Sequence, residues 1–151
     1  MSDITLSDYK IIPEMELVLQ VHKGTIDFSS IKKLKSEICK QPEYQSDFNF
    51  IIDIRDAEVI MSREELIAYG NMLFDKIEPT IPIKGAVLVK TPEQIATTMV
   101  VRLNLKSSLI EYQSFSNVKS CLAWIGVPNS KFNTMAIEAY ISSLKKEPVQ
   151  D

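Results

Sequence analysis

The chain is poor in the residues from which catalytic, redox and phosphate-binding sites are most often built. Among its 151 residues there are one histidine, two cysteines and four glycines. A lone histidine without a G-x-S-x-G sequence predicts no serine nucleophile with a histidine base, and the isolated glycines predict no glycine-rich phosphate loop. Cys39 and Cys121 form no C-x-x-C pattern, so we expect reduced thiols. The sequence therefore predicts no catalytic residue, no metal site and no cofactor.

Long apolar runs are also missing. The longest run, residues 121–125, has five residues, whereas a membrane-spanning helix needs about 20. The first residues contain neither a basic cluster nor an apolar stretch before a small-residue cleavage site, so we expect a cytoplasmic protein without membrane insertion. With 17 basic and 20 acidic residues the formal net charge is −3, which gives no general attraction to nucleic acid.

Apolar residues nevertheless make up 45% of the chain and charged residues 25%, as in a soluble folded domain. A chain of about 150 residues buries about 68 to 70% of the surface that it exposes when unfolded, so neither a disulfide nor a metal is needed for stability. Only residues 127–130 resemble a linker, and this segment is too short to separate domains. We expect a single domain over residues 1–151.

The spacing of apolar and turn residues predicts strands that alternate with helices. The expected elements, in chain order, are strands at 9–13 and 16–24, a helix to residue 40 capped by Thr25 or Asp27, a strand at 48–54, a helix from Ser62, a strand at 83–90, a helix from Pro92 to residue 106, a strand at 109–115, a helix from Ser116 to Trp124 and a helix at 130–146. Helical crossovers imply parallel strands, whereas the short first turn implies an antiparallel pair. The expected fold class is α/β, in the order β-β-α-β-α-β-α-β-α with one appended helix.

The order and spacing of several short motifs resemble a known family. The motifs are Tyr9-Lys10-Ile11-Ile12-Pro13, Gly24, Pro42-Glu43-Tyr44, Phe50-Ile51-Ile52-Asp53-Ile54-Arg55-Asp56-Ala57, Ala86-Val87-Leu88-Val89, Thr91-Pro92-Glu93-Gln94, and Phe115 before Ala123-Trp124-Ile125. Over residues 9–126 the chain resembles the SpoIIAA-like branch of the STAS superfamily, which includes the bacterial anti-sigma-factor antagonists. The resemblance implies a mixed, mostly parallel five-stranded sheet with helices packed on it, to which residues 130–146 add a helix.

In those antagonists a serine just beyond the central strand is phosphorylated by a partner kinase and thereby controls partner binding. Here the central strand leads into Asp53-Ile54-Arg55-Asp56-Ala57, and the nearest serine is Ser62. A helix start would stabilise a phosphate there, but Ser62 opens an S-x-x-E capping box, and Glu64 and Glu65 would repel the phosphate. The resemblance therefore implies a non-enzymatic regulatory or protein-interaction module, and we expect it to lack the usual serine phosphoswitch.

A charged cluster at the predicted carboxyl end of the central strand is the main candidate for contact with a ligand or a partner. It consists of Asp53, Arg55, Asp56 and Glu58, to which Ser62 is added as a nearby candidate. Two carboxylates there could hold a cation or act as acid and base. In the competing structural interpretation Arg55 pairs with Asp53 or Asp56. His22 is expected to be a partly exposed sheet residue.

Self-association is predicted through the helix that begins at Pro92. Its expected core stripe is Ile95, Ala96, Met99, Val100 and Leu103. The opposite, uncharged face is the candidate interface of a homodimer and consists of Gln94, Thr97, Thr98, Val101 and Leu105. A stripe on the last helix, Phe132, Ala136, Ala139, Tyr140 and Leu144, is expected to cover its own sheet.

Two function classes stay open after this reading. The first is an interaction module with a protein partner that the sequence does not identify. The second is a carrier or sensor of a small apolar ligand or lipid, because the resemblance extends to lipid-binding relatives of similar fold. An enclosed apolar pocket would favour the carrier, and a solid core would favour the interaction module.

Overall fold

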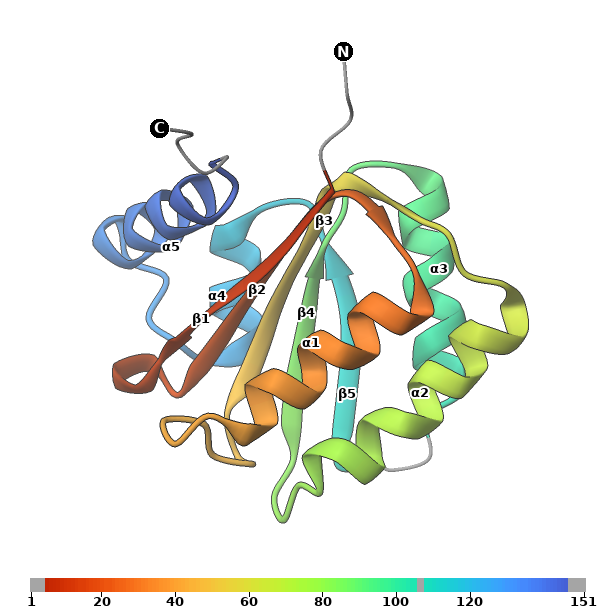
Figure 1. The fold of residues 1–151 in the computed structure, drawn as a ribbon. Helices are drawn as coiled ribbons and strands as arrows, with labels where there is room; N and C mark the ends of the chain where they lie inside the picture. Colours follow the sequence, from red (N-terminus) through yellow and green to blue (C-terminus); the bar gives the residue numbers. More distant parts are fainter. Residues whose placement is uncertain (1–4, 106–107, 147–151) are drawn as a thin grey trace, which may run out of the picture.

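The computed structural model describes residues 5–105 and 108–146, which form a five-stranded sheet between two layers of helices (Figure 1). The elements are β1 (Leu6–Ile12), η1 (Pro13–Met15), β2 (Leu17–Ile26), α1 (Phe28–Lys40), β3 (Asn49–Val59), α2 (Arg63–Ile77), β4 (Ile83–Leu88), α3 (Pro92–Leu103), β5 (Ile110–Phe115), α4 (Val118–Ile125) and α5 (Lys131–Leu144). The predicted order of strands and helices is confirmed. No helix within the described ranges is long and apolar enough to cross a membrane.

The sheet follows the chain in the order β1-β2-β3-β4-β5. β1 runs antiparallel to β2, and every other neighbouring pair is parallel, as the connection lengths predict. Alternate residues of the central strands point to opposite faces. One face packs against α1, α2 and α3, and the other packs against α4 and α5, so that the sheet is buried on both sides.

The central strand β3 is longer than the sequence predicts. It pairs with β4 only as far as Asp53 opposite Leu88, but it pairs with β2 as far as Val59 opposite Ile26, beyond an irregularity between Val21 and Lys23. β2 itself extends to Ile26 and supplies this additional ladder. The charged cluster therefore lies within the carboxyl-terminal half of β3, and the expectation that the strand ends at residue 54 is wrong.

Side-chain caps fix most helix starts. Ser62 and Glu65 form the predicted capping box, in which the Glu65 N–H donates to Ser62 Oγ (3.1 Å) and the Ser62 N–H donates to a Glu65 carboxylate oxygen (2.9 Å). Asp27 caps α1. The cap of α4 is Asn117 and not the predicted Ser116, because the side-chain oxygen Oδ1 of Asn117 accepts from the Ser120 N–H at 2.8 Å.

The structure reverses the predicted orientation of α3. Gln94, Thr98 and Val101 are buried, and Thr97 and Leu105 are partly buried, so these residues do not form an outer face. Of the residues predicted as core, Val100 packs against the core, but Ala96 is exposed and three others are largely exposed: 44% for Ile95, 50% for Met99 and 76% for Leu103. The polar residues are tolerated inside because they are hydrogen-bonded, as when Thr98 Oγ1 donates to the Gln94 carbonyl (2.9 Å).

α5 packs on its own protein, as predicted. It contacts β1, β2 and α4, and it buries Ile137 and Ile141 in the core on that face of the sheet. Of the predicted stripe, Tyr140 and Leu144 pack against this core, whereas Phe132 and Ala139 are exposed. The inward stripe is therefore rotated from the predicted one toward Ile137 and Ile141.

Candidate functional site

The side chain of Gln94 holds the extended part of β3 against the start of α3. Its Nε2 donates to the carbonyl oxygens of Ile54 (2.8 Å) and Ala57 (3.0 Å), and its Oε1 accepts from the backbone N–H groups of Lys90 (2.6 Å) and Thr91 (3.2 Å). Because β4 stops pairing at Leu88, these carbonyls have no strand partner on that side. Gln94 therefore replaces the missing ladder and fixes the candidate segment.

Asp53 forms the centre of a buried ion-pair network. Its side chain is fully buried and accepts two hydrogen bonds from the Arg55 guanidinium (both 3.0 Å) and one contact from Lys145 Nζ (2.8 Å) at the end of α5. Burial by itself would raise the pKa of Asp53, but the hydrogen bonds from Arg55 and Lys145 outweigh burial and hold the pKa below its usual value. Asp53 and Arg55 thus satisfy each other, as the structural interpretation predicts.

The other three candidate residues, Asp56, Glu58 and Ser62, lie in different surroundings. Asp56 is half-exposed and pairs with Lys145 (2.9 Å) and Lys90 (3.6 Å). Glu58 is exposed and lines a separate groove between β3 and α3, whereas Ser62 caps α2. The structure therefore brings together Asp53, Arg55 and Asp56 but adds neither Glu58 nor Ser62 to this network. In residues 5–105 and 108–146 no three histidine, cysteine, aspartate or glutamate residues are placed to hold a metal ion.

Lys145 is the member of the network that the sequence did not indicate. Nothing in its spacing relates it to Asp53, and only the packing of α5 on the sheet brings the two together. The sequence does show that Lys145 is a basic residue at the carboxyl end of a helix. The helix dipole already accounts for a basic residue there, so this feature does not indicate a contact with Asp53.

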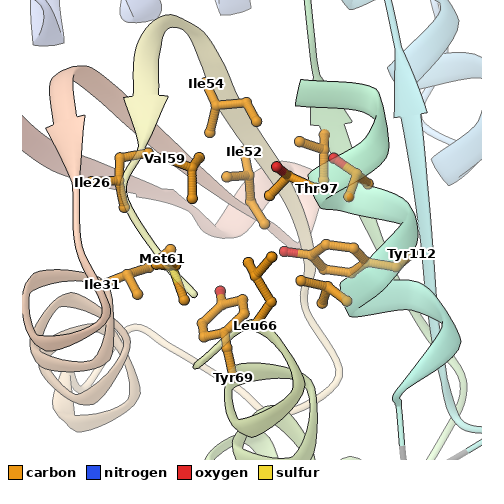
Figure 2. A pocket seen from close by; sticks show the side chains of 13 residues that line it. Ile26, Ile31, Ile52, Ile54, Val59, Met61, Leu66, Tyr69, Thr97 and Tyr112 are labelled. Atoms are coloured by element: carbon orange, nitrogen blue, oxygen red, sulfur yellow. The ribbon is translucent and has the colours of Figure 1, made fainter. Parts of the chain in front are cut away.

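An apolar cavity of about 40 Å³ lies between the sheet and the helices α2 and α3 (Figure 2). Its lining is made of Ile26, Ile31, Ile52, Ile54, Val59, Met61, Leu66, Tyr69, Val87, Thr97, Thr98, Val101 and Tyr112. The hydroxyl groups of Tyr69 and Tyr112 point toward this space and interact with each other. Since one water needs about 10 to 15 Å³ of such space, the cavity has room for a few waters.

The outer face of α3 is an apolar stripe. Ile95, Met99 and Leu103 follow one another at intervals of four residues, and exposed Ala96 lies between them. Exposed Glu93 and Arg102 border the stripe. A helix of a monomeric domain normally presents polar residues to water, so this face has the composition of a contact surface.

Comparison with known proteins gives a match in fold. No family model matches the sequence, and no curated protein matches it. Among solved structures, the chain is similar to an uncharacterized protein of the DUF3478 family, with a SpoIIAA-like fold, from Shewanella loihica PV-4. The superposition has a TM-score of 0.57 at 14% sequence identity and covers 83% of this chain and 98% of that one. The chain has a SpoIIAA-like fold.

The edge of this SpoIIAA-like sheet contains a buried polar cluster that the sequence did not predict. His22 is fully buried, so the expected partial exposure is wrong; its ring nitrogens lie 2.8 Å from Ser7 Oγ and 2.8 Å from Gln20 Nε2. Burial, with a smaller effect of Lys35, lowers the pKa of His22 to about 4.

Lys35 on α1 covers the same region of the SpoIIAA-like sheet. Its side chain is buried, and its Nζ lies 3.8 Å from the centroid of the Phe50 ring. Burial lowers the pKa of Lys35 to about 7. Its position could have been found from the sequence, because Lys35 falls on the inward stripe of α1 beside Ile31 and Ile38.

Proposed function

We propose that the chain is a non-enzymatic regulatory or protein-interaction module of STAS type that binds a protein partner through the outer face of α3. The observation that carries this proposal is the exposed stripe of Ile95, Met99 and Leu103. Large apolar side chains at intervals of four residues form the kind of face that docks into an apolar groove of another protein. The Gln94 contacts support a preformed interface, since they hold the first turn of α3 to β3.

The arrangement of the polar residues supports a non-enzymatic module without the serine phosphoswitch. Asp53, Arg55 and Lys145 are paired with one another. Ser62 Oγ accepts from the Glu65 N–H, and the Glu65 carboxylate lies at the Ser62 N–H, where it would repel a phosphate. We also propose a cytoplasmic location, which the two unbridged cysteines, Cys39 and Cys121, support.

A second copy is a weaker choice of partner than a different protein. In a symmetric homodimer, burial of the exposed parts of Ile95, Met99 and Leu103 on both copies contributes about 5 to 10 kcal/mol. This gain is comparable with the cost of association, about 4 to 15 kcal/mol. We therefore propose that any homodimer through α3 is weak, and light scattering at micromolar concentration should give a monomeric mass.

Affinity capture with a matched control tests the proposal. The double variant Met99→Glu/Leu103→Glu places charge on the stripe, and Ile81→Glu places it on another exposed isoleucine, 49% exposed, between α2 and β4. We expect a protein from the source cells to be retained by the wild type and by Ile81→Glu and lost by the double variant. Capture of the same protein by all three chains would contradict the proposal. Circular dichroism checks that each variant is folded.

The apolar cavity favours a second candidate, a carrier or sensor of a small apolar ligand or lipid. Its lining is apolar, and the Tyr69 and Tyr112 hydroxyls, which point into it, could donate to a polar group of a ligand. A lipid would need α2 and α3 to separate, because the present volume holds only a few waters. Native mass spectrometry of the purified chain tests this candidate: a stoichiometric lipid supports it, and the bare mass of the polypeptide counts against it.

A further inference from the structure

A second groove, with a largely apolar lining, lies between η1 and the start of α5. These two elements lie on the side of the molecule opposite α3 (Figure 1). The groove has a volume of about 680 Å³. Ile12, Pro13 and Met15 line it from the β1–β2 connection, Val127 and Pro128 line it from the α4–α5 connection, and Phe132, Ala136 and Tyr140 line it from α5. It shares no residue with the α3 stripe.

Phe132 makes this groove unusual for a protein surface. Its side chain is 79% exposed, and Met135, on the next turn of the same helix, is 60% exposed. Phenylalanine and methionine are enriched in the cores of protein interfaces and are seldom left in water side by side. The packing of α5 does not explain them, because α5 buries Ile137 and Ile141 instead.

The walls of the groove are fixed by local hydrogen bonds. The Asn133 side-chain amide donates to the Pro128 carbonyl (2.9 Å), and Ser130 caps α5 by accepting from the Asn133 N–H (3.1 Å). On the opposite wall the Glu16 N–H donates to the Pro13 carbonyl (3.0 Å). A preformed groove keeps the loss of conformational freedom on binding small.

The charged residues in and beside the groove indicate which kind of partner it favours. Glu14 and Glu16 are exposed on the η1 wall, and neither carboxylate forms an ion pair with a described residue. Lys10 lies over the Tyr140 ring at 4.8 Å, and exposed Lys131 precedes Phe132 on the opposite wall. The charged residues that line the groove itself are both acidic, which favours a basic group next to the apolar contacts.

We propose that this groove binds a short apolar segment of a protein partner that places a lysine or arginine side chain against Glu14 and Glu16. The apolar residues of the segment cover Phe132 and fill the space between Met15 and Tyr140. The groove is separate from the α3 face, so the chain can hold two partners at once and bring them together.

A peptide selection tests this proposal. A phage-displayed library of random peptides is selected on the full chain, and the most enriched peptide is synthesised, labelled and titrated by fluorescence anisotropy. The variants are Phe132→Ala and Glu14→Gln/Glu16→Gln, which change exposed side chains only. Ile81→Ala is the matched control, because it truncates an exposed apolar side chain between α2 and β4, outside both the α3 face and the groove.

We expect enriched peptides to combine apolar residues with lysine or arginine. Phe132→Ala should weaken binding at least about tenfold, as for a residue at the centre of an interface. The glutamate-to-glutamine pair should weaken binding and reduce its salt dependence, and Ile81→Ala should leave the affinity unchanged.

Three results would overturn the proposal: no enrichment, enrichment of acidic peptides, or binding that survives Phe132→Ala. Sedimentation of the chain alone could give a fourth result against the proposal. Self-association that Phe132→Ala abolishes would identify a second copy, and not a basic segment of another protein, as the occupant.

Discussion

Replacing Gln94 by alanine should destabilise the protein far more than its place on a surface helix suggests. The substitution removes the donor to the Ile54 and Ala57 carbonyls and the acceptor for the N–H groups of Lys90 and Thr91. The two donor contacts to β3 are buried, and a buried polar group left without a partner costs about 1 to 3 kcal/mol. We therefore expect the free energy of unfolding to fall by about 2 to 5 kcal/mol.

Urea titration and thermal unfolding measure this loss. For a chain of this length 1 kcal/mol corresponds to about 2 to 4 °C, so the melting temperature should fall by about 4 to 20 °C. Gln113→Ala, at an exposed position of β5, is the matched control and should change stability by less than about 0.5 kcal/mol.

Gln94→Glu separates hydrogen bonding from packing, since the side chain keeps its size. A carboxylate at this position cannot donate and would face the Ile54 and Ala57 carbonyls. At neutral pH we expect a loss at least as large as that of alanine, with partial recovery in acid when the carboxyl group becomes a donor. A loss of less than about 1 kcal/mol for Gln94→Ala would refute the role given to these contacts.

Two further substitutions test the packing of the core. Burial lowers the pKa of Lys35 to about 7, so between this pH and the ordinary lysine pKa of 10.5 the unfolded chain binds more protons and stability should rise with pH. Lys35→Met should stabilise the protein at pH 7. It should also reduce the increase in unfolding free energy between pH 7 and pH 9, measured by urea titration. An unchanged increase would contradict the lowered pKa of Lys35. Gly85→Ala should cost about 1 to 3 kcal/mol in thermal unfolding, because the added Cβ would lie 2.7 Å from the Tyr112 ring; an unaltered melting temperature would show that the ring moves freely.

The sequence predicted the arrangement of the fold because that arrangement depends on local signals. Period and capping residues mark the elements, and helical crossovers give parallel strands. The same signals could not give the length of β3, which depends on the extension of β2 to Ile26 as its partner. They also could not give the Asp53–Lys145 contact, which exists only because α5 folds back onto the sheet.

The orientation of α3 shows where periodicity fails. The helix has an apolar and an uncharged polar stripe, and hydrophobicity favours the apolar one as core. The structure buries the polar stripe because Gln94 and Thr98 find backbone partners inside. A sequence pattern records no hydrogen-bond partners, so the sequence predicts as core the face of α3 that we propose for a protein partner.

In-cell photocrosslinking from α3 tests the partner interface most directly. The photoreactive residue p-benzoylphenylalanine replaces Leu103 in one chain and Ile81 in another, and each chain is irradiated in the source cells. We predict a discrete crosslinked protein from position 103 and none from position 81. A chain that gives no adduct at position 103, or the same adduct at both positions, would contradict the assignment of this face to a partner.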